Sequence, residues 1–407
     1  MLGAGDVIRI RAAPWWQAAA ARIDERISTF PRGARVALLY GADADGFASA
    51  YFMSALLRAD RFVVEERAVW NHEYDLLWLA DYVAGSGAAA VVALDIPVMR
   101  DPALMRRLGA TLPVTAYDHH VGGAAERETH PGVTYLNSRL IDEGGANHPA
   151  SAFAAAFAVE RIPDLGPAEL YVLLAGLIGD RAEERHPELC RRLDDRFPEL
   201  APCAGRGSEV RRLTRGIDAL FRASIGTTPT GALAALRHLL TTQPPARALE
   251  EFARTMHLDA FEAKLQGDVD RIVARFRGIP PVAVIAEVIE DLSSFSIGVA
   301  ASRLARSGTA GVVVLGFHLG DKACFEMRTS QPHIDITSVL ELQRQRFTPL
   351  NAGGHPNAAG AVVHTGDADT FMQTFVSALQ QVVGVDHANA RGAKERERRD
   401  SNPRPPA

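Results

Sequence analysis

The stretch RVALLYGADADG, residues 35–46, places an apolar run directly before a loop with two carboxylates. Arg35 to Tyr40 has the length and composition of a buried strand, and a helix is predicted to begin near Gly46. Ligands of α/β folds bind where such a strand gives way to the next helix. The stretch therefore predicts an α/β fold with Asp43 and Asp45 at its ligand-binding edge.

Similar apolar runs follow along the first half of the chain, and predicted helices separate most of them. They lie at 62–69, 90–95, 113–117 and 133–136. Alternating strands and helices predict a doubly wound parallel sheet. Asp95 ends one run, and the motif Asp118-His119-His120 directly follows another. Because ligands of such sheets bind beyond the carboxyl ends of the strands, these side chains are candidates for one functional site.

A chain of 407 residues is long enough for two or three structural units. We expect a first α/β domain over 1–187. Residues 188–278 are charged and predicted to be helical without strands, which indicates a helical connector. Strand and helix patterns return over 279–386 as a second, smaller α/β domain, and 387–407 has the composition of a disordered tail.

Composition limits the partners that the protein can have. Apolar residues make up 47% and charged residues 23%, which is ordinary globular usage. A net charge of -5 gives no overall attraction to nucleic acid, so a polyanion would need a local basic patch or a metal centre. Cys190, Cys203 and Cys324 are too scattered for a disulfide framework, and Leu170 to Ile178 is about half a membrane span. We expect a soluble cytoplasmic protein with no membrane partner, and a homodimer is one assembly open to it.

The strand-end residues form a candidate metal site. Asp180 joins them, because it follows an apolar helical segment as the others follow strands. Carboxylate oxygens with one or two imidazoles suit Mn²⁺ or Mg²⁺ better than a structural Zn²⁺. Two ions about 3.5 to 4 Å apart would activate a water and stabilise charge on a phosphoryl oxygen. The alternatives are a helix N-cap at Asp43 and loop-capping roles for Asp95 and Asp180.

A second motif, GGHPNAAG at 353–360, has the composition of an anion site. Consecutive glycines leave backbone N–H groups accessible, and His355 adds a donor that can be cationic. Arg328 ends a predicted strand and could make a bidentate phosphate contact. A bare glycine turn and a surface arginine are the alternatives.

Together the Asp-x-Asp, Asp-His-His and Gly-Gly-His motifs resemble those of the DHH phosphoesterase superfamily, in the branch with a DHH-associated C-terminal domain. That branch includes RecJ-like exonucleases and nanoRNases, and the similarity covers about 35–180 and 281–383. The resemblance implies two Mn²⁺ ions, one held by Asp43 and Asp95 and the other by Asp45, Asp95, His119 and Asp180.

The resemblance also implies roles for the remaining motif residues. His120 would contact a phosphate and Asp118 would orient the site, so these two are the expected catalytic residues. The substrate clamp would comprise Gly353, Gly354, His355 and Asn357, with Arg328 as a further contact.

Asp180 lacks the Thr-Asp-Thr-Gly context common in nanoRNase-type members, and two further positions depart from the family pattern. Ala352 replaces the first glycine of the clamp, and Gly41 stands where the family usually places an Asp or His ligand. The first ion would then lack one protein ligand, so one bound ion is an alternative to two. His72 is a candidate replacement.

The favoured function is a metal-dependent phosphodiesterase of exonuclease type that acts on short single-stranded oligonucleotides or small nucleotides. The alternative is a catalytically weakened nucleotide or nucleic-acid binding protein. A haloacid-dehalogenase-like phosphatase also uses Asp-x-Asp-Gly, with the first Asp as nucleophile, but it leaves Asp118-His119-His120 unexplained.

Overall fold

The computed structural model describes residues 14–70, 77–98, 102–120, 130–141, 148–162, 169–183, 209–223, 231–278, 282–344, 346–347 and 351–381. The chain forms two compact units. The first comprises Met1–Gln266 with Ser293–Phe295, and the second comprises Gly267–Leu292 with Ser296–Ala407. Most of the segment expected to be a separate connector therefore belongs with the first unit. The predicted disordered tail lies outside the described residues.

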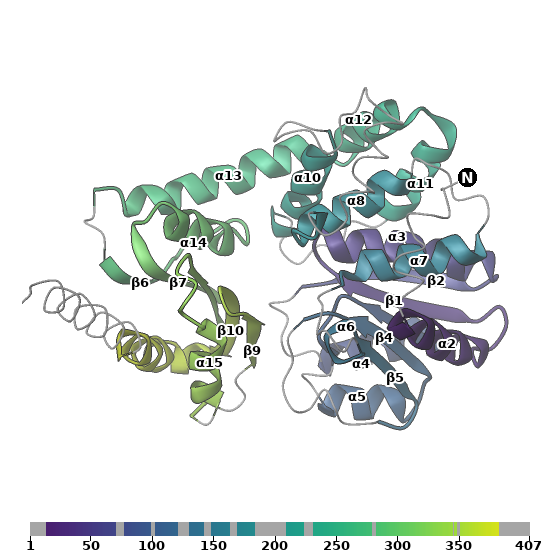
Figure 1. Cartoon of the computed structure of the whole chain (residues 1–407), viewed down its shortest axis with the longest axis horizontal. Helices are drawn as coiled ribbons and strands as arrows, with labels where there is room; N and C mark the ends of the chain where they lie inside the picture. The colour runs from purple at the N-terminus through teal and green to yellow at the C-terminus, as the bar shows by residue number, and fades with distance from the viewer. Residues whose placement is uncertain are drawn as a thin grey trace, which may run out of the picture. The chain divides into compact units, whose positions relative to one another are not determined.

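The first unit contains a five-stranded, fully parallel sheet in the order β2-β1-β3-β4-β5 (Figure 1). Its strands are β1 (Arg35–Gly41), β2 (Val63–Val69), β3 (Ala90–Leu94), β4 (Val114–Asp118) and β5 (Val133–Asn137). The doubly wound prediction is confirmed. The chain moves outward from β1 to β2 and then returns to the other side of β1 at β3, so the topological switch point lies between β1 and β3. Ligands of open α/β sheets bind at this point.

Both faces of the sheet are covered by helices. On one face, strand residues such as Ala37 and Leu39 share a buried cluster with α4 (Leu77–Ser86) and α5 (Pro102–Gly109). Figure 1 shows α3 (Ala44–Ala59) and α7 (Ala150–Arg161) along the other face. Strands buried on both faces have nearly continuous apolar sequences, which explains why β3 and β4 were identifiable from the sequence.

Helix α8 (Glu169–Gly179) packs closely against α3 and α7 because two of its residues are glycines. A Cβ atom on Gly176 would lie 2.6 Å from the Ser151 Oγ and 2.8 Å from the Ala48 Cβ. A Cβ atom on Gly179 would lie 2.9 Å from the Ala44 Cβ. The small residues thus bring the end of α8 to the start of α3.

The described part of 188–278 is helical, as predicted. It contains α10 (Glu209–Ala223), α11 (Ala232–Thr242), α12 (Pro245–Thr255) and α13 (Leu258–Arg275). Phe221 of α10 contacts the rings of Tyr40, Phe47 and Trp70. Trp70 also packs on Phe295, with ring centroids 4.6 Å apart. These contacts place α10 beside the end of β1. The first unit is completed by α2 (Pro14–Ser28) and α6 (Ser138–Ile141).

The second unit is a smaller α/β domain with a mixed sheet, which also confirms the prediction. Its strands are β6 (Val282–Val288), β7 (Ala310–Leu319), β8 (Lys322–Thr329), β9 (Asn351–His355) and β10 (Ala358–His364), in the order β6-β7-β8-β10-β9. Strands β6 and β7 are parallel and the other pairs are antiparallel. Its helices are α14 (Ile297–Arg306), α15 (Ile336–Arg344), the short η5 (Thr365–Asp367) and 368–381. Within the described residues of both units, no helix has the length and apolar composition needed to cross a membrane.

Candidate metal centre

Two glycines are required at the end of β1, because Gly41 lies against the residue that follows β3 and Gly46 of α3 lies against Gly41. A Cβ atom on Gly41 would lie 2.5 Å from the Asp95 Oδ2 and 2.7 Å from the Asp95 carbonyl oxygen. A Cβ atom on Gly46 would lie 2.0 Å from the Gly41 carbonyl oxygen. Position 41 therefore has no room for a ligating side chain unless Asp95 moves.

Asp95 lies at the centre of the cluster, directly after β3. Its backbone has a φ of 58°, in the left-handed region that Asp tolerates better than most residues do. The residue is 1% exposed, and its Oδ2 is a buried oxygen with no hydrogen-bond partner among the described residues. Burial, and then the charges of Asp43 and Asp45, raise the pKa of this carboxyl well above its usual value. A buried carboxylate without full compensation is costly, and a bound cation would remove that cost.

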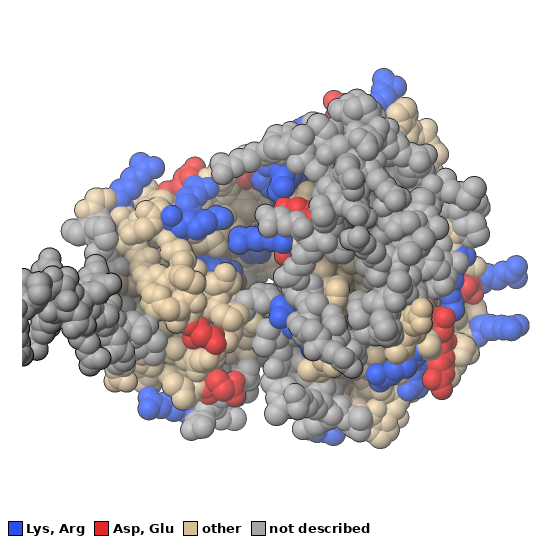
Figure 2. All heavy atoms as spheres, in the orientation of Figure 1, with Lys and Arg blue, Asp and Glu red and all other residues tan. Residues whose placement is uncertain are grey.

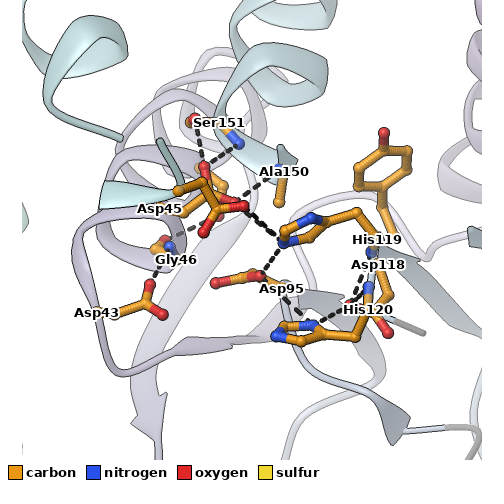
Figure 3. A network of polar contacts seen from close by, with 12 residues as sticks. Asp43, Asp45, Gly46, Asp95, Asp118, His119, His120, Ala150 and Ser151 are labelled. Carbon is orange, nitrogen blue, oxygen red and sulfur yellow. Dashed lines mark hydrogen bonds and ion pairs between the residues drawn. The ribbon is translucent and has the colours of Figure 1, made fainter. Parts of the chain in front are cut away.

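His119 connects three of the carboxylates, and Figure 3 shows its ring beside two of them, Asp45 and Asp95. Its Nε2 lies 2.9 Å from the Asp95 Oδ1, 3.3 Å from the Asp180 Oδ2 and 3.7 Å from the Asp45 Oδ2. Burial lowers the pKa of this imidazole, but the neighbouring carboxylates, Asp180 foremost, outweigh it and raise the pKa well above its usual value. Potential ligand atoms of Asp45, His119 and Asp180 lie within 4.8 Å of one another, and so do those of Asp95, His119 and His120.

Asp45 also holds the start of α7. Its Oδ2 accepts a hydrogen bond of 2.8 Å from the Ala150 N–H, and its Oδ1 accepts one of 3.0 Å from the Ser151 N–H. The Ser151 hydroxyl donates to the same Oδ1. A carboxylate at a helix N-terminus is favoured by the exposed N–H groups and the helix dipole. Burial, followed by the charge of Asp180, nevertheless raises the pKa of Asp45 to about 7.

Asp118 arranges the two histidines. Its Oδ1 accepts hydrogen bonds from the His119 N–H at 2.8 Å and from the His120 N–H at 3.2 Å. The same oxygen lies 2.7 Å from the His120 Nδ1, and the Tyr135 hydroxyl donates to the Oδ2 at 3.3 Å. The carboxylate thereby fixes the orientation of the His120 ring, and it is itself fully buried. This geometry suits the roles expected for Asp118 and His120, which remain predictions.

Asp43 takes the N-cap position of α3, and its Oδ1 accepts a hydrogen bond of 2.9 Å from the Gly46 N–H. The N-cap alternative is therefore realised, although the charge of Asp43 still acts on Asp95. Asp43 belongs to neither group of clustered ligand atoms, so its role as a metal ligand remains a prediction. His72 lies outside the described residues.

One residue of this neighbourhood was missed by the sequence analysis. Asp218 of α10 accepts a hydrogen bond of 2.9 Å at its Oδ1 from the Ala44 N–H. Burial raises its pKa to about 7, Arg222 acts to lower it, and Asp43 acts to raise it further. In the sequence, Asp218 is a single acidic residue between Ile217 and Ala219 in an arginine-rich helical segment. That pattern does not indicate a metal or catalytic site.

The glycine motif of the second unit forms a β-hairpin, whereas the sequence was interpreted as an anion site, with a bare glycine turn as the alternative. Gly353 and Gly354 lie in β9 and pair with Gly360 and Ala359 of β10. Gly354 has a φ of 144°, and a Cβ atom there would lie 2.4 Å from the Ala358 carbonyl oxygen. Only glycine allows this approach of the two strands.

The other expected clamp residues are placed around this hairpin. Asn357 lies in the exposed turn, where its carbonyl accepts a hydrogen bond from the Thr329 N–H. His355 ends β9, and its side chain lies outside the described residues.

Arg328 is engaged within the second unit. Its Nη2 lies 2.7 Å from the Glu326 Oε2, its Nε donates to the Ser302 Oγ at 3.1 Å, and its Nη1 donates to the Ala359 carbonyl at 3.2 Å. A phosphate contact would have to compete with these partners. That role and the clamp roles of the hairpin residues remain predictions.

The donor set of the first unit fits a divalent cation. Asp45, Asp95, Asp180 and His119 offer mostly hard oxygen ligands, and their formal charges are far from balanced by one imidazole. The unpartnered Asp95 Oδ2 gives a specific oxygen that an ion could occupy. These four residues are the ligands expected for the second ion, and the structure brings them together. Gly41 provides no side-chain ligand for the first ion.

Comparisons with known proteins agree with this fold. Residues 282–383 match the DHHA1 domain family. RecJ from Thermus thermophilus, in complex with Mn²⁺, superposes with a TM-score of 0.63 at 19% identity, over 91% of this chain and 55% of that chain. This chain therefore spans about half the length of that RecJ.

Two further solved structures are similar over most of both chains. An exonuclease RecJ bound to manganese has a TM-score of 0.59 and 18% identity, over 90% of this chain and 94% of that one. The DHH domain of a protein from a family of ribosomal proteins has a TM-score of 0.61 and 14% identity, over 90% of this chain and 92% of that one. No curated protein matches the sequence significantly.

The protein is thus a two-unit α/β protein whose fold is similar to those of RecJ and of that DHH domain. Within the second unit, residues 282–383 match the DHHA1 domain family, which agrees with the DHH-associated C-terminal domain that the motifs predicted.

Proposed function

We propose that the protein is a metal-dependent phosphodiesterase that acts on short single-stranded oligonucleotides or small nucleotides. The observation that carries the proposal is the buried Asp95 Oδ2, which has no hydrogen-bond partner among the described residues and lies among further carboxylates at the topological switch point. Such an arrangement is stable when a cation shares the carboxylate oxygens. The structures of RecJ with Mn²⁺ and with Mg²⁺ support these two ions as candidates.

The residues of the site divide into holding and orienting groups. Asp45, Asp95, His119 and Asp180 would hold one ion, and Asp43 with Asp95 a second if it binds. Bound divalent ions would supply an activated water and offset the charge that develops on the phosphoryl oxygens. His120, oriented by Asp118 through its Nδ1, would donate a hydrogen bond to a phosphate oxygen of the substrate.

Arginines on the surface of α13 and α14 are paired with acidic residues, which favours the metal centre as the main site of anion binding. Figure 2 shows both basic and acidic side chains on the face that it displays. Several arginines of α13 and α14 are paired. Arg271 lies 2.5 Å from Asp268, Arg303 lies 2.6 Å from Asp270, and Arg275 is paired with Glu287. Short substrates held mainly at the ions suit such a surface better than long nucleic acid does.

A substrate screen with metal analysis on the same sample tests the proposal. The purified protein with Mn²⁺ would be incubated with dinucleotides, short RNA and DNA strands, cyclic dinucleotides, 3'-phosphoadenosine 5'-phosphate and polyphosphate. Hydrolysis of a diester substrate that disappears in Asp95→Asn is the expected result. A protein that carries Mn²⁺ and hydrolyses none of them would refute the phosphodiesterase assignment.

The close packing of Gly41 favours a second candidate, a nucleotide-binding protein with weakened catalysis. Since a Cβ at position 41 would lie 2.5 Å from the Asp95 Oδ2, this chain cannot present the family's usual ligand there. Calorimetric titration with Mn²⁺ separates the two candidates. Two tightly bound ions per chain would argue against the binding protein, and one ion with tight nucleotide binding but no turnover would support it.

A further inference from the structure

The backbone of the metal-binding loop is held by a helix that lies far away in sequence. Asp218 of α10 accepts a hydrogen bond of 2.9 Å from the Ala44 N–H, across 174 residues of chain. Ala44 lies between Asp43 and Asp45 and is the first residue of α3, so its N–H has no acceptor within its own helix. A carboxylate from α10 therefore satisfies the backbone donor between the two aspartates of the first motif.

Asp218 belongs to the same electrostatic neighbourhood as the metal centre. Besides Arg222 on its own helix, Asp43 and Asp180 both act on its charge. It is absent, however, from the two groups of clustered ligand atoms among the described residues. Its position thus suits a residue that supports the ligands better than one that binds the ion.

Helix α10 is itself firmly held, as a positioning element must be. The carbonyl of Arg222 accepts a hydrogen bond of 2.7 Å from the Phe295 N–H, and the carbonyl of Ala223 accepts one of 2.8 Å from the Lys264 Nζ. Gly216 allows Leu258 to pack closely, because a Cβ atom there would lie 2.9 Å from the Leu258 side chain. Asp218 is therefore presented to the loop from a fixed support.

We propose that Asp218 is a positioning residue of the metal centre. Its hydrogen bond to the Ala44 N–H fixes the backbone between Asp43 and Asp45, so that both carboxylates keep the orientation that binds the ion. This contact from α10 acts together with the hydrogen bonds from the Gly46 N–H to Asp43 and from the Ala150 N–H to Asp45. The inference rests on the metal-binding part of the proposed function, and it does not depend on the identity of the substrate.

The test compares Asp218→Asn with Asp218→Ala in the full-length protein. Asparagine keeps an Oδ1 acceptor for the Ala44 N–H and removes the charge, whereas alanine removes both. Mn²⁺ affinity, measured calorimetrically without substrate, should stay within about threefold of wild type in the Asn variant and weaken about 10- to 100-fold in the Ala variant. Arg212→Ala, which breaks an exposed ion pair of α10 with Asp259, is the matched control and should bind as wild type does.

Each outcome decides the matter. Equal weakening in the Asn and Ala variants would overturn the proposal, because the charge of Asp218 and not its acceptor would then be needed. Wild-type affinity in the Ala variant would overturn it as well, and so would a wild-type protein that binds no Mn²⁺. If the Ala variant does not fold, Asp218→Ser takes its place, since the shorter hydroxyl cannot reach the Ala44 N–H. A wild-type protein that binds Mn²⁺ without hydrolysing any substrate refutes the phosphodiesterase alone and leaves this comparison valid.

Discussion

Replacing Asp95 with asparagine removes one negative charge from the centre of the cluster and keeps the shape of the side chain. Asparagine tolerates the left-handed φ of 58° about as well as aspartate does, and its amide oxygen can still face His119. The metal-free variant should be at least as stable as wild type, because burial and neighbouring carboxylates disfavour the charge that is lost. Binding of Mn²⁺ should weaken roughly 100-fold, because Asp95 contributes to both predicted ion sites.

The size of the effect follows from linkage between binding and folding. At a Mn²⁺ concentration 100 times the Kd, an ion that binds only the folded protein stabilises it by about 2.7 kcal/mol. A roughly 100-fold weaker Kd leaves about 0.4 kcal/mol at the same concentration. The first unit comprises about 270 residues, and at this size 1 kcal/mol shifts Tm by about 2 °C, so the rise in Tm would fall from about 5 °C to about 1 °C.

Differential scanning calorimetry with and without Mn²⁺ measures both quantities. Asp335→Asn, at the exposed start of α15 in the second unit, is the matched control and should keep the full Mn²⁺-dependent rise. The reasoning is refuted if Asp95→Asn keeps that rise as well.

Three further predictions concern the same site. Gly41→Ala should destabilise the protein by roughly 1–3 kcal/mol and weaken Mn²⁺ binding, because the new Cβ would lie 2.5 Å from the Asp95 Oδ2. Chemical denaturation measures the loss of stability. The control is Gly85→Ala in α4, where a Cβ has open space, and this variant should be as stable as wild type. His120→Ala should lower turnover roughly 100-fold or more while the Kd for Mn²⁺ changes only a few-fold, and an equal loss of metal binding would make His120 a ligand. The metal-free protein should lose stability as pH rises from about 4 to 7. The pKa of Asp45 is about 7 in the folded protein, above its ordinary value of 3.8. Over this pH range the folded state therefore holds a proton that the unfolded chain releases, so a rise in pH favours unfolding. The rise in Tm that Mn²⁺ causes should therefore grow over the same pH range, and a constant rise in calorimetric scans would contradict this.

The strand-end residues were predictable because their signals are local. Each of Asp43, Asp95 and Asp118 follows an apolar run, and parallel strands deliver their carboxyl ends to one edge of the sheet. The order of the strands adds the switch point between β1 and β3, which a single sequence cannot provide. The structure adds the geometry of the motif at 118–120, in which Asp118 orients the His120 ring and His119 contacts the Asp95 carboxylate.

Contacts between distant segments could not be predicted in the same way. The hydrogen bonds from Ala150 and Ser151 to Asp45 span 105 and 106 residues, and they depend on how α7 packs on α3. Asp218 lies in a helix that only tertiary packing brings to the first motif. The hairpin of β9 and β10 was missed because its glycines and alanines give a weak strand signal, and pairing between the strands overrides it.

Anomalous diffraction from crystals grown with Mn²⁺ tests the central claim most directly. We predict a strong Mn²⁺ peak within coordination distance of the Asp95 Oδ2 and of the side chains of Asp45, His119 and Asp180. An anomalous map with no peak at these residues, from protein shown to be folded and at saturating Mn²⁺, would contradict the assignment of a metal centre.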